Sequence, residues 1–177
     1  MTTARSKSLA LVAIAAGASL QAAQGVPMLQ FNEKKFTLTH SFPFKMKVPD
    51  FAAMTDADRR AGKLKWKESQ AIALSDKPFD AAALQKLDSP LEALDEMAKK
   101  GAAVVIAAAA SPGTASMVRV ALPGAETIVE PDNTAASLTF NPPQGGKVTG
   151  KLVLKGDRKM HEFDPAHVPF IEIDASF

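Results

Sequence analysis

The chain has 177 residues, which is the size of a single domain. Hydrophobic residues make up 46% of it and charged residues 23%, a globular composition that excludes a disordered or fibrous chain. It contains no cysteine, which excludes disulfide bonds, thiolate catalysis and cysteine-ligated zinc or iron–sulfur sites.

The beginning of the chain has the pattern of a secretory signal peptide. Arg5 and Lys7 precede an uncharged apolar run over Leu9–Leu20, and small residues follow this run. The run is shorter than the ~20 residues of a membrane-spanning helix, and no later segment is apolar for long enough to span a bilayer. We therefore expect a signal peptide at 1–23, a single β-rich domain at 24–177, and a periplasmic or secreted protein without a transmembrane segment.

The small positive charge of the chain belongs to this leader. The whole sequence has 21 Lys and Arg residues against 19 Asp and Glu residues, and removal of Arg5 and Lys7 takes away the excess. The remaining domain has a formal charge of about zero, so it lacks the overall positive charge typical of nucleic-acid-binding proteins. We expect no nucleic-acid partner.

Alternating apolar and polar residues predict two strands early in the domain. Every second residue over 36–48 belongs to an apolar and aromatic set, which is typical of a half-buried strand. Pro43 cannot donate a ladder hydrogen bond, so this strand is expected at a sheet edge or with a bend. The stretch 63–74 alternates in the same way and places Trp66 on the side of Ile72, which is the expected core side.

A two-helix insert is predicted at about 80–100. Asp80 can cap a first helix over 80–87. The residues 89–92 read Ser-Pro-Leu-Glu, a capping box with proline at the first helical position, and predict a second helix over 90–100.

Short strands at regular spacing are expected in the rest of the domain. We place them at 102–110, 117–122, 126–130, 137–140, 148–154, 160–163 and 168–177. Between the two early strands, 55–62 forms a single helical turn or a loop. Many short strands separated by turns predict a mainly β protein with an antiparallel β-sandwich, for which an immunoglobulin-like topology is one possibility. An α+β fold and a small β-barrel are the alternatives.

One part of the chain resembles a family of uncharacterised exported bacterial proteins that are rich in β-structure. Residues 76–80 read Asp-Lys-Pro-Phe-Asp and match a D-K-P-hydrophobic-D turn that leads, in that family, into two short helices. Residues 148–152 read Val-Thr-Gly-Lys-Leu and match its late V-x-G-x-L strand. The resemblance covers about 69–177 and implies export and this architecture. The family has no assigned activity, so the resemblance implies no functional residue.

The most specific chemistry that the sequence offers is a histidine-based metal site. His161, Asp164 and His167 are the candidate ligands for zinc, nickel or copper. A strand over 160–163 and a turn after it would keep the two imidazoles too far apart for one ion. The favoured interpretation is a turn in which His167 lies near Asp164 while His161 is directed toward Phe170. We therefore assign no metal ligand and no cofactor.

No motif assigns a catalytic residue. Ser111 stands before a Pro-Gly turn and outside any nucleophile motif. The glycines over 144–148 precede a strand and lack the Ser or Thr of a phosphate-binding loop. The basic stretch 59–67 surrounds Trp66 and would suit a nucleic-acid strand, a glycan or an acidic lipid. The alternation places the tryptophan in the core, so a solvated strand face is favoured there.

These observations favour an exported, non-catalytic binding or structural module. Its partner is unknown, and a periplasmic or cell-envelope protein is the expected class. The alternatives are a hydrolase that uses carboxylates or a serine and a histidine-based metal-binding protein. A polar cleft around a carboxyl group of perturbed pKa would favour the hydrolase, and an exposed apolar patch would favour the binding module.

Overall fold

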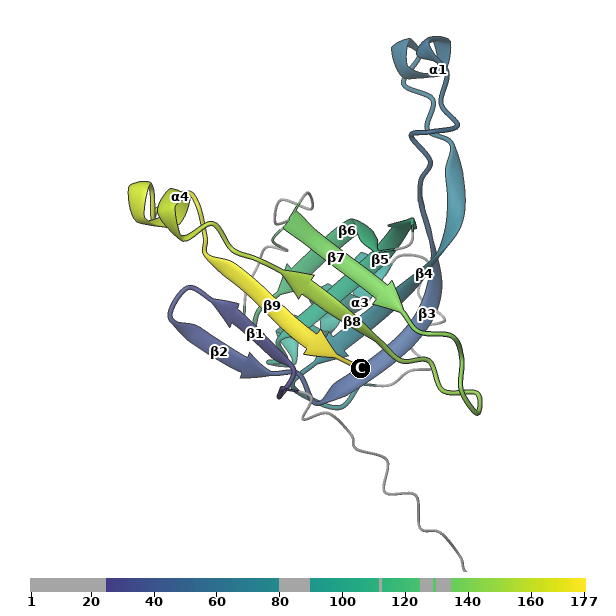
Figure 1. Cartoon of the computed structure of the whole chain (residues 1–177). Coiled ribbons are helices and arrows are strands. Elements are labelled where there is room, and N and C mark those ends of the chain that lie inside the picture. Colours follow the sequence, from purple (N-terminus) through teal and green to yellow (C-terminus); the bar gives the residue numbers. More distant parts are fainter. Residues whose placement is uncertain (1–24, 80–89, 112, 125–128, 130–134) are drawn as a thin grey trace, which may run out of the picture.

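The computed structural model describes residues 25–79, 90–111, 113–124, 129 and 135–177. Within these residues, nine strands form two antiparallel sheets that lie face to face and do not close into a barrel (Figure 1). The protein is therefore mainly β and consistent with a β-sandwich, as predicted. The expected signal peptide and the expected helix over 80–87 lie outside the described residues, as does the expected strand over 126–130 apart from Val129.

The five-stranded sheet joins the two ends of the domain. Its strand order is β2-β1-β9-β8-β7. The bounds are β1 (Met28–Phe31), β2 (Lys34–Thr37), β7 (Ala136–Phe140), β8 (Gly150–Leu154) and β9 (Ile171–Ser176). The last strand pairs with the first, with Ile173 opposite Leu29. The expected final strand is therefore present and buries Ile171 and Ile173.

The four-stranded sheet is a simple meander. Its order is β3-β4-β5-β6, with bounds β3 (His40–Pro49), β4 (Trp66–Ser75), β5 (Val104–Ser111) and β6 (Thr114–Ala121). In both sheets, neighbouring strands follow each other in the chain, except where β9 lies beside β1. This up-and-down order differs from the Greek-key order of immunoglobulin domains. As expected for a strand that contains Pro43, β3 lies at an edge.

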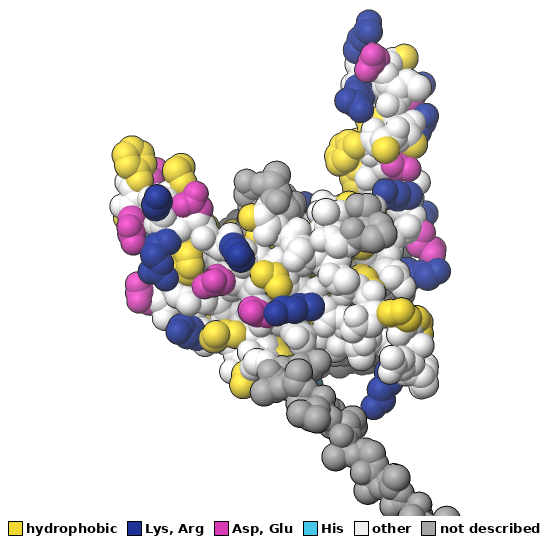
Figure 2. Space-filling model, in the orientation of Figure 1, with side chains coloured by type: hydrophobic (Ala, Val, Ile, Leu, Met, Phe, Trp, Pro, Cys, Tyr) yellow, Lys and Arg dark blue, Asp and Glu magenta, His cyan; other side chains and the backbone are white. Residues whose placement is uncertain are grey.

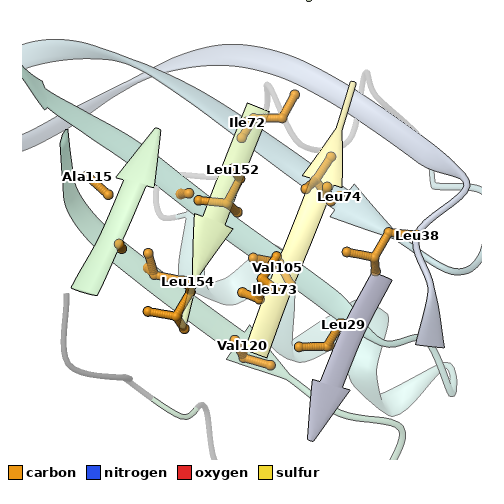
Figure 3. Packing of buried hydrophobic residues seen from close by; sticks show 14 of the residues in the cluster. Leu29, Leu38, Ile72, Leu74, Val105, Ala115, Val120, Leu152, Leu154 and Ile173 are labelled. Atoms are coloured by element: carbon orange, nitrogen blue, oxygen red, sulfur yellow. The ribbon is translucent and has the colours of Figure 1, made fainter. Parts of the chain in front are cut away.

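Two layers of buried side chains hold the fold together. The first lies between the sheets, where Leu29 and Ile173 meet Leu74 and Val105 (Figure 3). The second lies on the other face of the four-stranded sheet, beneath helix α3 (Pro90–Lys99). Here Leu94, which is fully buried, packs in one cluster with residues of that sheet. The second predicted helix therefore acts as a cover for this sheet.

The end of α3 has the geometry that its sequence favours. The N–H of Gly101 donates to the carbonyl of Ala98 at 2.8 Å, and the N–H of Ala102 donates to that of Met97 at 3.0 Å. Gly101 has a φ of 80°, a left-handed conformation that glycine adopts without a Cβ penalty. This turn leads the chain directly into β5.

The alternating stretch 36–48 forms two strands instead of one. The chain leaves β2 after Thr37 and enters β3 at His40, so that the two halves belong to different sheets. Leu38 is buried at this crossing, and its N–H donates to the carbonyl of Pro27 at 2.8 Å. The alternation of apolar and polar residues runs unbroken from β2 into β3. It therefore does not indicate that the chain passes from one sheet to the other here.

The segment 160–163 is helical, and the prediction of a strand there is wrong. Helix α4 (Arg158–Phe163) begins after Asp157, whose carboxylate accepts a hydrogen bond from the N–H of Met160 at 3.0 Å. An aspartate at this position satisfies an N–H that the helix itself leaves unpaired. Asp157 is thus the local signal that favours a helix over the expected turn and strand.

Candidate binding surface

The hairpin of β3 and β4 extends beyond the sandwich as an arm, which we define as residues 45–70. The two strands pair over their whole length, from His40 opposite Ser75 to Pro49 opposite Trp66. In contrast, β5 pairs with β4 only from Ala71 onward. Beyond that point Met46 and Val48 still belong to the buried cluster beneath α3, and the side chains of Ser69 and Lys67 still donate to carbonyls at the end of β5. The outer part of the ribbon has two strands and projects away from the body (Figure 1).

The end of the arm is folded without a buried core. It contains the short helix α1 (Asp56–Arg60), which begins at Thr55 and confirms the expected helical turn. None of the residues from 51 to 66 is buried. The N–H of Asp58 donates to the Thr55 hydroxyl at 3.1 Å, and the N–H of Thr55 donates to the Asp58 carboxylate at 3.0 Å. This capping box satisfies both backbone donors locally.

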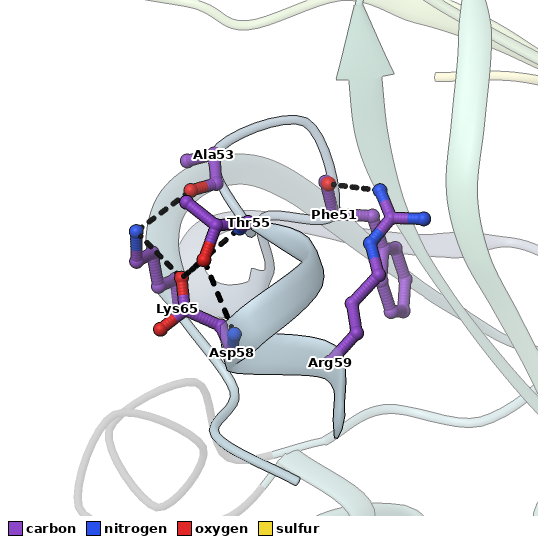
Figure 4. Close-up of polar contacts among 6 residues, drawn as sticks. All are labelled: Phe51, Ala53, Thr55, Asp58, Arg59 and Lys65. Carbon is purple, nitrogen blue, oxygen red and sulfur yellow. Dashed lines mark hydrogen bonds and ion pairs between the residues drawn. The ribbon is translucent and has the colours of Figure 1, made fainter. Parts of the chain in front are cut away.

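Charged side chains complete the network at the end of the arm (Figure 4). The Lys65 ammonium lies 3.0 Å from the Asp58 carboxylate and donates to the carbonyl of Ala53 at 2.8 Å. The Arg59 guanidinium donates to the carbonyl of Phe51 at 3.2 Å. The Thr55 hydroxyl and N–H, together with Lys65, lower the pKa of Asp58 to about 2. Polar contacts thus hold this loop in one conformation while its apolar side chains stay outside.

Trp66 lies on the arm and is exposed, so the prediction that it belongs to the core is wrong. The side chain has 56% of its surface exposed. It lies on the same face of β4 as Ile72, as the alternation predicted, but beyond the part of the strand that the other sheet covers. Glu68 and Gln70 share this face and are also exposed. These two polar residues between Trp66 and Ile72 were the sequence signal that the core ends there.

The second projection is the α4 loop, residues 155–170, between β8 and β9. The Arg158 guanidinium lies 4.6 Å from the centre of the Phe170 ring. His161 Nδ1 lies 2.7 Å from the carbonyl oxygen of Val168 and must carry the hydrogen, because a carbonyl only accepts. Arg158 and His161 are three residues apart and therefore share one side of the helix. This polar side holds α4 against 168–170.

The opposite side of α4 presents apolar residues to solvent. Phe163 follows His161 by two residues, about 200° around the helix, and therefore points away from the residues that hold the helix. Met160 lies three residues before Phe163 on the same side. Their exposed fractions are 50% for Met160 and 86% for Phe163. A surface helix of a globular protein normally turns its apolar side inward, so this orientation is reversed.

The proposed metal ligands are only partly brought together. His167 Nδ1 lies 2.9 Å from the Asp164 carboxylate, as the sequence predicted. His161 is turned to Val168 and lies 6.3 Å from the Phe170 ring, centre to centre, which also agrees with the expected direction. Within the described residues, no group of three or more His, Asp or Glu side chains could hold a metal ion.

Among the described residues, the two carboxyl groups whose pKa is clearly shifted, those of Asp58 and Glu68, lie on the exposed arm. Lys45, 2.7 Å away, lowers the pKa of Glu68 through a hydrogen bond and its charge, and Thr55 and Lys65 lower that of Asp58. A carboxyl group that acts as a general acid needs a raised pKa so that it stays protonated. The lowered pKa values of Glu68 and Asp58 instead keep both groups ionised, the form that suits ion pairing. Ser111 ends β5 opposite Thr114, which is the predicted turn position.

Exposed apolar side chains gather on the two projections. Among the described residues, the exposed large hydrophobic side chains outside them are Val26 and Met28. The others lie on the arm (Phe51, Leu64 and Trp66) and on the α4 loop (Met160 and Phe163). In the view of Figures 1 and 2, both projections extend on the side opposite the C-terminus, with hydrophobic side chains near their ends. They form a two-pronged surface of protruding apolar groups.

Comparisons of the chain with known protein families, curated proteins and solved structures found no match. Among the described helices, none is long and apolar enough to cross a membrane.

Proposed function

We propose that this chain is an exported, non-catalytic binding module that contacts its partner through the arm and the α4 loop. The observation that carries this proposal is the concentration of exposed apolar side chains on two projections. Exposed apolar groups that gather in one region mark interaction sites, whereas single ones scattered over a surface are ordinary.

The construction of both projections supports a contact function. The end of the arm uses a capping box and the cations Arg59 and Lys65 to fix its loop, and it buries none of its own side chains. Helix α4 uses Arg158 and His161 for the same purpose. In both projections, polar contacts fix the backbone conformation, so that the apolar side chains are not needed for folding and remain available to a partner. Such preorganisation reduces the entropy that binding would cost.

Site-specific photo-cross-linking in cells that express the full chain tests this function. A photoreactive phenylalanine analogue replaces Trp66 or Phe163, and the matched control carries it at Thr139, an exposed position on β7. We expect the same covalent partner at both projections and no such adduct at Thr139. The yield of the adduct should fall when Phe51→Ser is added to the variant with the probe at position 163, because the arm then loses an apolar contact with the same partner.

Equal cross-linking at Thr139 and at the two projections would contradict the proposal, as would the absence of adducts at both. Thermal unfolding of each variant serves as the folding control. Since neither Trp66 nor Phe163 is buried, all variants should unfold at the temperature of the unmodified protein.

A further inference from the structure

We infer that the partner of the two projections is the surface of an anionic lipid bilayer, an inference that rests on the proposed binding function. The first argument is the chemistry of the exposed side chains. The arm presents an indole, a phenyl ring and a leucine, and the α4 loop adds a phenyl ring and a methionine. Tryptophan, phenylalanine and leucine beside cations are the composition of segments that lie in the membrane interface.

The second argument is charge. Three cations of the arm are paired, since Lys45 lies by Glu68, Lys65 by Asp58 and Lys67 by Asp50. The remaining charged side chains of the arm form no ion pair with a described residue. They are four cations, Lys47, Arg59, Arg60 and Lys63, and one anion, Asp56. The arm therefore carries a net positive charge close to its exposed apolar groups, although the domain as a whole is about neutral.

The α4 loop is more balanced and contributes mainly apolar contact. Its cations are Lys155, Arg158 and Lys159, and its acidic residues are Asp157, Glu162 and Asp164, the last of which pairs with His167. We therefore assign the attraction to anionic head groups to the arm. Both prongs then insert apolar side chains at the level of the head groups.

The third argument is shape. Anchors in protein–protein interfaces fill pockets, and a protein partner would need two pockets at the spacing of the two prongs. A bilayer accepts separate protruding groups at any spacing along its surface. The space-filling view shows the two prongs as separate protrusions (Figure 2). A lipid surface thus explains the protrusion, the apolar side chains and the adjacent cations together.

Trp66 provides a direct readout, because it is the one tryptophan of the 177-residue sequence. The purified protein is mixed with vesicles of phosphatidylcholine alone or of equal parts phosphatidylcholine and phosphatidylglycerol. We expect flotation with the anionic vesicles only, a blue shift of the Trp66 emission, and quenching by lipids brominated in the acyl chain near the head group. Salt should weaken the binding, since the Debye length falls from about 10 Å at 0.1 M to about 3 Å at 1 M.

Matched variants locate the contact. We expect Phe163→Ser to lower vesicle partitioning about tenfold, and the control Val26→Ser, which changes an exposed side chain outside the prongs, to leave it unchanged. The double variant Arg60→Glu and Lys63→Glu should lower partitioning into anionic vesicles tenfold or more. The double variant Lys34→Glu and Lys35→Glu on β2 makes the same change of charge and should leave partitioning unchanged.

The outcomes separate this inference from the proposed function. Absence of vesicle binding, or binding that is unchanged in the prong variants, overturns the lipid inference. If the cross-linking experiment then captures one protein at both Trp66 and Phe163, the binding function stands with a protein partner. If it captures nothing at either position, the proposed function falls as well.

Discussion

At Gly150 the backbone of β8 leaves no room for a side chain. A Cβ atom there would overlap the carbonyl oxygen of Thr139 and would lie 2.6 Å from the Phe177 ring. That ring also packs edge-on against Phe140, with the ring centres 5.6 Å apart. We expect Gly150→Ala to reduce the free energy of unfolding by about 1–3 kcal/mol, because both the Thr139 carbonyl of the neighbouring strand and the terminal ring would have to move.

Urea denaturation measures this effect. The matched control is Gly25→Ala, because a Cβ atom at Gly25 would have no neighbour within 4 Å. Equal stability of the two variants would show that the strands around Gly150 can move apart at no cost, so that its close packing does not constrain the fold.

Asp58 is the arm residue with the larger pKa shift, so it is the better probe of how pH acts on the end of the arm. Its folded-state pKa of about 2 lies below the ordinary value of 3.8. The contacts of its carboxylate therefore stabilise the end of the arm above pH 3.8, and this contribution is lost as the pH falls through about 2. We expect Thr55→Ala to raise the pKa of Asp58 toward 3.8, because the hydroxyl and its hydrogen bond are removed.

A carboxyl-detected NMR titration measures that pKa, and Thr37→Ala on β2 is the control that should not change it. The free energy of global unfolding should change little in Thr55→Ala, since none of the residues from 51 to 66 is buried. A large loss of global stability would mean that the arm supports the sandwich.

At the scale of the element, α3 shows how far local sequence signals extend. Its start at Pro90 and its end before Gly101 were predicted from a Ser-Pro-Leu-Glu motif and a glycine, sequence signals that depend only on neighbouring residues. The position of the helix against the outer face of a sheet depends on contacts that are distant in sequence. The division of 36–48 between two sheets also depends on distant contacts, because strand pairing decides which sheet each half joins and the alternation of apolar residues does not.

The packing of α3 leads to a prediction for Leu94, which has no exposed surface. We expect Leu94→Ala to cost about 2–5 kcal/mol of unfolding free energy, because it leaves a cavity between the helix and the four-stranded sheet. Thermal and urea unfolding test it against Glu92→Ala, a change on the exposed side of the same helix. If the two variants are equally stable, α3 is only loosely attached to the sheet.

At the scale of the whole molecule, the two-sheet architecture was predicted, whereas the basic stretch 59–67 around Trp66 was recognised as a candidate surface but interpreted as a solvated strand face. Strand periodicity reports which side of a strand an apolar residue takes, and for Trp66 it reported that side correctly. The period alone does not show where the facing sheet ends, which decides whether Trp66 is buried; the polar residues Glu68 and Gln70 on the same face were the signal for that limit. Likewise, the direction of His161 toward Phe170 was predicted, but the helix α4 and the contact of Arg158 with the Phe170 ring, which turn its apolar side outward, were not.

Export is the remaining prediction for the whole molecule, and the sheet limits where a signal peptide could be cleaved without loss of core residues. Leu29 in β1 is fully buried opposite Ile173 of the last strand, so cleavage beyond Met28 would remove part of the core. The small residues after the apolar run predict a cleavage before that limit. We expect the mature protein to begin between Ser19 and Gly25.

N-terminal sequencing of protein from the extracytoplasmic fraction measures this start. Ile14→Arg places a charge within the apolar run and should leave unprocessed protein inside the cell, whereas Val26→Ala should be processed normally. An intact Met1 in the protein with the natural sequence would refute export by a cleaved signal. The proposed lipid contact would then have to occur inside the cell, where the anionic inner surface of the membrane offers the same chemistry.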